Sequence, residues 1–371
     1  MRLGVVTAIP WLPGKSQAEC FAETLDEVET AEALAFDTLW FTEHHFALHG
    51  LNSGLSAWLA AVAMRTRRVR IGSTVFVLPY WDPIRLAEDA AMVDILSGGR
   101  LEFGAGTGYR LDEFKGFNVP PEISREKGRE CLDVILQLWT GEPISFTGKY
   151  HTLNEVSVRP IPVQKPHPPI WWPGGSTESL EFIARRGYNW MSAATLASID
   201  AIVERRARLA DLLRGHGRAI EDIGIYVHVP TYVAHATRNE IRQVMEPGIR
   251  WFRDAALWYT AGPTPGGGTI YQRGGGPAPF DFESFYDGGA FFGDPETCVE
   301  KIERLWRVLR PTELVFLFKM GQAQDHVISS MELFAREVMP RVRALAKAEA
   351  RPGVPTLREE SCSSESTTSR S

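Results

Sequence analysis

Residues 68–110 read RVRIGSTVFVLPYWDPIRLAEDAAMVDILSGGRLEFGAGTGYR. The apolar runs Val69–Phe76 and Arg100–Ala105 have the composition of buried strands, and the amphipathic segment Ile84–Leu96 between them has the pattern of a helix. A strand, a helix and a second strand in this order are typical of two parallel strands joined by a crossover helix. The stretch therefore predicts a βαβ unit.

The same alternation continues on both sides of this unit. Further short apolar runs predict strands at Leu3–Ala8, Thr38–Thr42, Pro169–Pro173, Tyr188–Ser192, Ile223–Val233 and Glu313–Phe318. Amphipathic segments predict helices at Ala18–Leu34, Leu55–Arg65, Arg125–Trp139, Leu180–Arg186, Ile199–Arg214, Arg238–Tyr259, Pro295–Leu309 and His326–Lys347. Because eight strands with helices between them close naturally into a barrel, we expect an α/β protein with a TIM-type (β/α)8 barrel.

Two connections are too long for simple turns and predict insertions. Gly141–His167, between the fourth and fifth strands, is rich in proline and has room for a short hairpin. Thr260–Gly293, after the seventh strand, contains GPTPGGG and RGGGPAP, so we expect an irregular, mobile lid there. Residues 1–350 then form a single barrel domain, and the serine-rich residues 351–371 form a disordered tail.

Composition excludes several classes of protein. The 371 residues are 44% hydrophobic, and their net charge of −6 comes without the basic patch that nucleic-acid binders carry. The four cysteines lie far apart without CxxC spacing, which suits a reducing compartment. The N-terminal apolar run is shorter than that of a signal peptide, and no run reaches the length of a membrane span. We expect a cytoplasmic protein that binds neither nucleic acid nor membranes.

Glu43, His44 and His45 follow the second predicted strand directly. Catalytic groups of barrel enzymes lie at the carboxyl ends of strands, and histidines titrate near neutral pH, so these residues are candidates for general acid–base catalysis. A metal site that also uses His49 is one alternative. Histidines that only tie a loop to the barrel rim are the other, because glycines close behind favour a loop.

Three glycines end the fourth predicted strand, at Gly104, Gly106 and Gly108 in the string FGAGTGYR. They do not form the dinucleotide-binding pattern GxGxxG, because Tyr109 stands at the third glycine position. Glycines here allow the backbone to approach a flat or bulky group closely, and a tight turn is the alternative.

The fifth predicted strand is followed by Gly174, Gly175, Ser176, Thr177 and Ser179, which open a helix. Small residues and hydroxyls at a helix N-terminus offer free N–H groups and a favourable dipole to an anion. A plain N-cap at Ser176 or Thr177 is the alternative.

Aromatic side chains suggest the walls of an apolar substrate pocket. The candidates are Trp190 and Trp251, together with Phe252, Trp258 and Tyr259. Packing in the core is the alternative for each of them.

Taken together, these strings resemble the bacterial-luciferase-like, flavin-dependent monooxygenases. The resemblance rests on LWFTEHHF with HGL after it, on residues 68–117, on PPIWWPGGSTESLEFIARRGY, on GDPETCVEKIERLW and on SSMELFAREVMPRVRALA, in the same order over about four-fifths of the chain. The EHHF string is similar to the luciferase alpha-subunit side of the family more than to its deazaflavin-dependent side.

The resemblance implies a (β/α)8 barrel that binds FMN at the carboxyl ends of its strands. It places the flavin ring against a non-proline cis peptide, at Thr74 and Val75 in this chain. It places the flavin phosphate at the helix that Gly175, Ser176 and Ser179 open. The family habit also implies a homodimer.

The resemblance carries over to the histidines as well. His44 matches the histidine near the reactive edge of the flavin, and His45 matches its neighbour. The chain departs from the alpha subunit at Gly106 and Thr107, where that subunit has a cysteine facing the flavin and an arginine on its phosphate. We include both positions in the cofactor site. Arg110 lies nearby but is displaced in sequence from the arginine of the alpha subunit, so the resemblance does not identify the group that neutralises the phosphate. It implies neither an aldehyde substrate nor light emission.

Our hypothesis is that a separate flavin reductase supplies FMNH2, because the chain shows no nicotinamide fingerprint. The reduced flavin then reacts with O2 at its C4a carbon, and the resulting peroxyflavin oxygenates a small apolar organic substrate in a closed site. His44 acts as acid or base, and His45 or Glu43 orients it. The alternatives are an F420-dependent hydride-transfer enzyme, a non-catalytic flavin-binding protein or silent subunit, and a zinc hydrolase built on Glu43, His45 and His49.

Overall fold

The computed structural model describes residues 1–195, 197–257 and 281–348. Eight of its strands span Arg2–Thr7 (β1), Thr38–Phe41 (β2), Arg70–Ser73 (β3), Leu101–Gly106 (β5), Ile170–Pro173 (β8), Asn189–Ala193 (β9), Ile225–Val233 (β10) and Glu313–Leu317 (β12). Each pairs with the next in parallel, and β12 pairs with both β10 and β1, so the sheet closes into a barrel. The predicted (β/α)8 barrel is confirmed.

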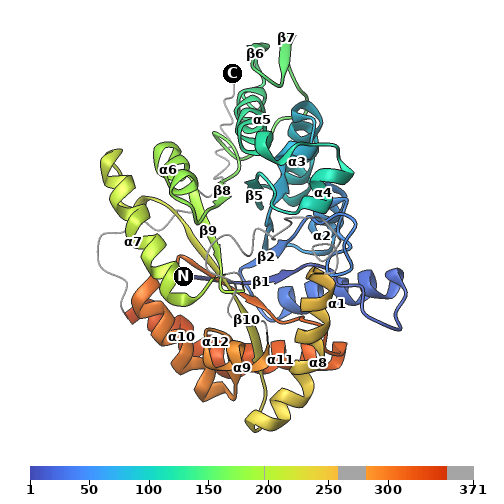
Figure 1. Cartoon of the computed structure of the whole chain (residues 1–371), viewed down its shortest axis with the longest axis vertical. Helices are drawn as coiled ribbons and strands as arrows, with labels where there is room; N and C mark the ends of the chain where they lie inside the picture. The colour runs from blue at the N-terminus through green and yellow to red at the C-terminus, as the bar shows by residue number, and fades with distance from the viewer. Residues whose placement is uncertain (196, 258–280, 349–371) are drawn as a thin grey trace, which may run out of the picture.

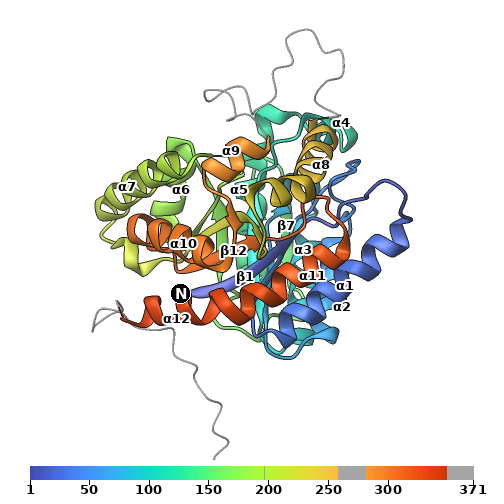
Figure 2. The same cartoon turned by 90° about the horizontal axis from the view of Figure 1, so that it is seen from below.

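Helices cover the outside of this barrel (Figure 1). They are α1 (Gln17–Ala33), α2 (Leu55–Arg65), α3 (Pro83–Ser97), α4 (Leu111–Gly116), α5 (Ser124–Leu138), α6 (Thr177–Arg186), α7 (Ile199–Gly215), α8 (Arg238–Leu257), α9 (Phe282–Asp287), α10 (Pro295–Leu309), α11 (Gln324–Leu333) and α12 (Met339–Ala348). A π-helical turn at Phe334–Val338 joins α11 to α12. In Figure 2, α11 lies alongside α1 and α12 continues beyond it.

Local sequence explains where several helices begin. Asp82 accepts two backbone N–H groups of the first turn of α3, and Pro83 is the first helical residue. At the start of α10, Asp294 accepts the N–H of Thr297, and Pro295 is the first helical residue. An aspartate cap satisfies N–H groups that have no partner within the helix, and proline lacks an N–H to leave unpaired at this position.

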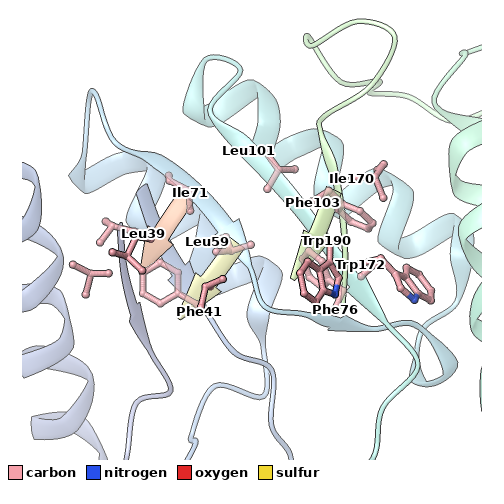
Figure 3. Packing of buried hydrophobic residues seen from close by; sticks show 14 of the residues in the cluster. Leu39, Phe41, Leu59, Ile71, Phe76, Leu101, Phe103, Ile170, Trp172 and Trp190 are labelled. Carbon is pink, nitrogen blue, oxygen red and sulfur yellow. The ribbon is translucent and has the colours of Figure 1, made fainter. Parts of the chain in front are cut away.

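The outer core fills the space between strands and helices. Figure 3 shows part of this layer, with Phe76, Phe103, Trp172 and Trp190 drawn together. Phe76 stacks on Phe103 with ring centroids 5.2 Å apart. These residues alternate along their strands with side chains that point into the barrel, which is the pattern expected of strands buried on both faces.

The inside of the barrel is closed near the N-terminal ends of the strands. Arg2 bridges the carboxylates of Glu102 and Glu313, at 2.5 Å from each. The rings of Trp40, Trp171 and Tyr226 pack next to them, with Trp40 5.5 Å from Trp171 and 5.0 Å from Tyr226. Because this end of the barrel is filled, a ligand has access only from the carboxyl ends of the strands.

The insertions differ in part from the sequence predictions. The fourth and fifth barrel strands are separated by an antiparallel hairpin, β6 (Ile144–Thr147) and β7 (Thr152–Val156), as predicted. The third predicted strand is broken after Ser73 and resumes as β4 (Phe76–Val77), which pairs with β5. The segment predicted to be an irregular lid holds α9 and the strand β11 (Phe291–Gly293) in its last part. Its residues up to 280, and the predicted tail 351–371, lie outside the described residues.

Candidate active site at the carboxyl ends of the strands

The end of β3 is fixed by a close approach of β5. The Ser73 hydroxyl donates to the carbonyl of Gly104 at 2.7 Å and accepts the Gly104 N–H at 2.8 Å. A Cβ at position 104 would lie 1.9 Å from the Ser73 carbonyl oxygen, so only glycine fits. Directly after Ser73, the peptide bond between Thr74 and Val75 is cis, as the resemblance implied. Both residues are partly exposed at the end of the barrel.

Glu43 accepts hydrogen bonds from His45 and from the loop after β4. Its Oε1 accepts from His45 Nε2 at 2.9 Å and from the Trp81 indole at 3.0 Å, and its Oε2 accepts the Val77 N–H at 3.0 Å. The His45 ring packs on Phe117, with centroids 4.5 Å apart. Glu43 and His45 are therefore bonded to each other, and Glu43 also binds the loop after β4.

His44 has a different partner. Its Nδ1 lies 3.1 Å from Oε1 of Glu113, and the same oxygen accepts the backbone N–H of His45 at 3.1 Å. Since this oxygen acts as an acceptor, we assign the proton of the His44 ring to Nδ1, which leaves Nε2 as a free base. Burial, Arg110 and His45 together lower the pKa of His44 to about 3. The ring is thus neutral at physiological pH, with Nε2 unprotonated.

Glu113 was not predicted from the sequence. It lies on the six-residue helix α4, and burial raises the pKa of its carboxyl group. Arg110, at the start of this helix, pairs with Asp112 at 2.7 Å and approaches Glu113 at 3.5 Å. The charge of Arg110 therefore lies next to Glu113, the partner of His44. No spacing rule connects Glu113 with a histidine 69 positions earlier.

His49 packs against His44, a contact that the sequence did not indicate. Its ring centroid lies 4.5 Å from that of His44 and 5.7 Å from that of Phe252 on α8. The side chain is buried, and Nδ1 has no hydrogen-bond partner in the described part of the chain. Burial is the largest cause that lowers the pKa of His49 far below its usual value. An unsatisfied buried polar group costs stability and marks positions that are kept for function.

Replacing His49 with phenylalanine is expected to raise the free energy of unfolding at pH 7 by about 1 kcal/mol, because an unpaired buried polar atom is removed. The variant should also resist acid better. His49 stays neutral when folded but takes up a proton near pH 6.5 when unfolded, so wild-type stability falls as the pH drops below about 6.5. One such proton contributes a slope of about 1.4 kcal/mol per pH unit, which the variant loses. Urea unfolding between pH 4 and 8 measures both effects.

The matched control is His235→Phe, at an exposed histidine, which should change stability by less than about 0.5 kcal/mol. If His49→Phe destabilises the protein at pH 7 and keeps the wild-type slope, the ring is a satisfied part of the core.

The start of α6 presents hydroxyl groups to solvent. Ser176 is the N-cap, as one alternative predicted, and its Oγ accepts the Ser179 N–H at 3.2 Å. The two hydroxyl oxygens lie 3.0 Å apart and are exposed. Because this contact leaves lone pairs and other N–H groups at the helix start available, capping and anion binding are compatible here.

Other predicted site residues lie elsewhere. Trp190 is buried in the outer core, where its indole donates to the Gly174 carbonyl at 2.7 Å, which agrees with core packing, the alternative to a wall of the substrate pocket. Trp251 lies on α8 in an outer groove of about 520 Å³ lined by residues of that helix, while its neighbour Phe252 meets His49. A Cβ at Gly106 would lie 2.7 Å from a methyl group of Val75. Trp258 and Tyr259 are outside the described residues.

A family model described as luciferase-like monooxygenase matches residues 1–311. The chain belongs to the luciferase-like monooxygenase family. It is 31% identical over 178 residues to the oxygenase component of the flavin-dependent trigonelline monooxygenase of Acinetobacter baylyi, a match that covers 47% of this chain and 49% of that protein. It is 26% identical to limonene 1,2-monooxygenase of Rhodococcus erythropolis, over 89% of this chain and 84% of that protein. The chain spans about half the length of the first curated relatives that it matches.

Solved structures share the fold of this luciferase-like chain. Monooxygenase RslO1 from Streptomyces bottropensis superimposes with a TM-score of 0.79 at 24% identity, over 92% of this chain and 99% of that one. The oxygenating component of 3,6-diketocamphane monooxygenase from Pseudomonas putida, solved with FMN, gives 0.73 at 19% identity, over 92% and 98%. An F420-dependent secondary alcohol dehydrogenase gives 0.70 at 17% identity, over 92% and 99%. FMN-binding and F420-dependent proteins thus share this barrel.

The zinc alternative is not supported by the geometry of this luciferase-like chain. Glu43 and His45 face the loop after β4, whereas His49 packs against His44 and Phe252. Over the described residues, no three His, Cys, Asp or Glu side chains are grouped as metal ligands. The same residues contain no helix that is long and apolar enough to cross a membrane.

Proposed function

We propose that the chain is the oxygenase component of a two-component monooxygenase, which receives FMNH2 from a separate reductase and uses O2 to oxygenate a small apolar substrate. The observation that carries this proposal is the neutral His44, held by Glu113 through Nδ1, in the segment that follows β2, whose neighbouring strand β3 is followed by the Thr74–Val75 cis peptide. An imidazole with a free Nε2 at this place is suited to accept a proton beside a bound flavin.

The residues at the mouth of the barrel fit a flavin. Thr74 and Val75 are partly exposed, and the buried Nδ1 of His49 has no partner among the described residues. Gly175, Ser176 and Ser179 provide N–H and hydroxyl groups for a phosphate. When bound, the reduced flavin would supply the reaction with oxygen.

The protein's own part is to position groups and to hold a proton. His44 Nε2 accepts a proton, and the Glu113 carboxylate at Nδ1 stabilises the charge that develops on the ring. Glu43 and His45 fix the loop that carries Trp81. Phe252 adds an apolar wall beside the histidines, which favours exclusion of water from the site.

Reductase partner, substrate class and cofactor follow from different observations. The relative from Acinetobacter is named an oxygenase component, which supports a separate reductase. The relative from Rhodococcus is named for limonene, which supports an apolar substrate. FMN is preferred to F420 because the sequence is similar to the alpha-subunit side of the family. We also propose a cytoplasmic location, because the four cysteines lie far apart without CxxC spacing, which suits a reducing compartment.

The experiment is to mix the protein anaerobically with FMNH2, add oxygen and follow the flavin spectrum. Reoxidation clearly slower than that of free FMNH2, with turnover of an apolar substrate panel, is the expected result. Reoxidation at the free rate together with reduction of a substrate by reduced F420 would replace the proposal with hydride transfer. Flavin binding without turnover on either route would indicate a silent subunit or a flavin-binding protein.

We also propose a homodimer. α2 and α3 pack side by side and expose apolar side chains: Met64 on α2, and Met92, Ile95 and Leu96 on one face of α3. Clustered exposed apolar residues are typical of protein interfaces. Sedimentation equilibrium should give twice the chain mass, and Met92→Glu with Ile95→Glu should give the monomer mass.

A further inference from the structure

Two polar side chains of β10, Tyr226 and His228, face the inside of the barrel. The residues that alternate with them along the strand, Ile225, Val227 and Val229, belong to the outer core. Tyr226 packs on the tryptophan ring that helps to close the barrel. His228 comes two residues later, nearer the open end, and is partly exposed.

A chain of hydrogen bonds runs through these two residues. The Tyr226 hydroxyl lies 3.3 Å from Nδ1 of His228, and Nε2 of His228 lies 2.9 Å from the hydroxyl of Thr195, just beyond β9. Burial raises the pKa of Tyr226 well above its usual value and the charge of Glu313 adds to this, whereas a hydrogen bond with the Thr74 side chain opposes it. The chain therefore joins the Thr74 hydroxyl to that of Thr195, and both of these residues are partly exposed.

This chain crosses the barrel. β3, which Thr74 follows, is separated from β10 by β12, β1 and β2 on one side and by β9, β8 and β5 on the other, so the two strands lie opposite each other. Thr74 forms the cis peptide with Val75, at the proposed flavin site. Thr195 lies beyond the end of β9, the strand next to β10. The hydrogen bonds thus connect the proposed cofactor site with the opposite wall of the barrel mouth.

Every member of the chain can both donate and accept a hydrogen bond. Each hydroxyl does both, and a neutral imidazole donates from one ring nitrogen while it accepts at the other. Burial lowers the pKa of His228 to about 4, so its ring is neutral at pH 7. The hydrogen bonds can therefore point along the chain in either direction, whereas apolar side chains of the same shape would serve packing equally well.

We propose that this chain is a proton relay, with His228 at its centre, between the cofactor site at Thr74 and solvent at Thr195. This inference rests on the proposed function. In one passage, the Thr74 hydroxyl gives its proton to the reacting groups and takes one from Tyr226. Tyr226 takes the Nδ1 proton of His228, whose Nε2 takes a proton from Thr195. Thr195 is reprotonated by an acid in the solvent, so one proton leaves, one enters, and every member ends neutral.

The first measurement is of binding and needs no turnover. Nitrogen NMR of protein labelled at its histidine rings should show a neutral His228 at pH 7, identified by its absence from His228→Ala. Oxidised FMN should shift both ring nitrogens in wild type, because a new partner at Thr74 reorients the chain. It should leave them in place in Tyr226→Phe, where the link to Thr74 is cut. Ring nitrogens that do not respond in wild type, or that respond equally in both proteins, overturn the relay.

The second measurement is single-turnover oxygenation. His228→Ala and Tyr226→Phe should each be about tenfold slower or more, with FMN affinity within about threefold of wild type. The double variant should be no slower than the slower single variant, because either change breaks the same chain. Added imidazole should restore His228→Ala, whose partly exposed position gives it access, and should not restore Tyr226→Phe. Losses that multiply in the double variant, or no response of His228→Ala to imidazole, overturn the relay.

His326→Ala is the matched control, because Nδ1 of His326 lies 3.1 Å from the hydroxyl of Tyr232, another tyrosine of β10. It should oxygenate at the wild-type rate with or without imidazole, and a loss equal to that of His228→Ala overturns the role of His228. A response of the His228 nitrogens to FMN in a wild type that oxygenates no substrate would support the chain and overturn the proposed function. Failure of FMN to bind wild type would overturn both.

Discussion

Replacing His44 with alanine is expected to slow oxygenation by roughly 10²- to 10⁴-fold, the usual contribution of a general base, while FMN affinity stays within about threefold of wild type. Glu113 keeps the His44 proton on Nδ1 and leaves Nε2 as the base that alanine removes. Single-turnover product yield from FMNH2 and O2 measures the rate, and a flavin titration measures the affinity.

Glu113→Gln tests whether Glu113 controls the protonation of His44 or only packs against it. Its amide can donate to Nδ1 and so favour the tautomer with the proton on Nε2, with little change in shape. Turnover should fall and its pH dependence should change, while the flavin affinity does not. Product yield from His44→Ala equal to that of wild type would remove His44 from the mechanism.

The barrel could be predicted because its signals are local and repeated. Buried parallel strands are continuous apolar runs, and caps such as Asp82 with Pro83 mark the helices between them. The break in the third strand could not be predicted in this way. Apolar and β-branched residues continue through Val69–Phe76. The interruption coincides with the contact of Ser73 with Gly104 on another strand, which the local sequence does not show.

Site residues that directly follow a strand could be predicted, whereas contacts between site residues far apart in the sequence were missed. The string EHH after β2 predicted His44 as a site residue. Its partner Glu113 lies on the short helix α4, which has no capping side chain by which the sequence could predict the helix. His49 looked like a metal ligand because only its spacing was visible. Trp190 was predicted to line the pocket because an aromatic residue type does not indicate which face of β9 the side chain occupies. A shift of one residue along the strand moves a side chain to the opposite face.

The ion pairs at the N-terminal end of the barrel are expected to contribute strongly to the free energy of unfolding. Glu102 is almost fully buried, pairs with Arg2 and Arg70, and accepts the Trp171 indole at 2.5 Å. Glu102→Leu removes the carboxylate and leaves both guanidinium groups short of a partner. We expect a loss of about 3–5 kcal/mol in the free energy of unfolding, measured by urea denaturation at pH 7.

Acid titration gives this prediction a second readout. Burial opposes ionisation of Glu102, but Arg2 and Arg70 outweigh it and lower the pKa of its carboxyl group. A carboxylate with a lowered folded pKa stabilises the protein above the unfolded value, near pH 4, and the stabilisation disappears as the pH falls through the folded value. Glu102→Leu should therefore flatten the acid limb of the stability curve. Glu29→Leu breaks an exposed pair with Arg65 and should cost less than about 1 kcal/mol, so equal losses from the two variants would show that the buried network contributes no more than a surface ion pair.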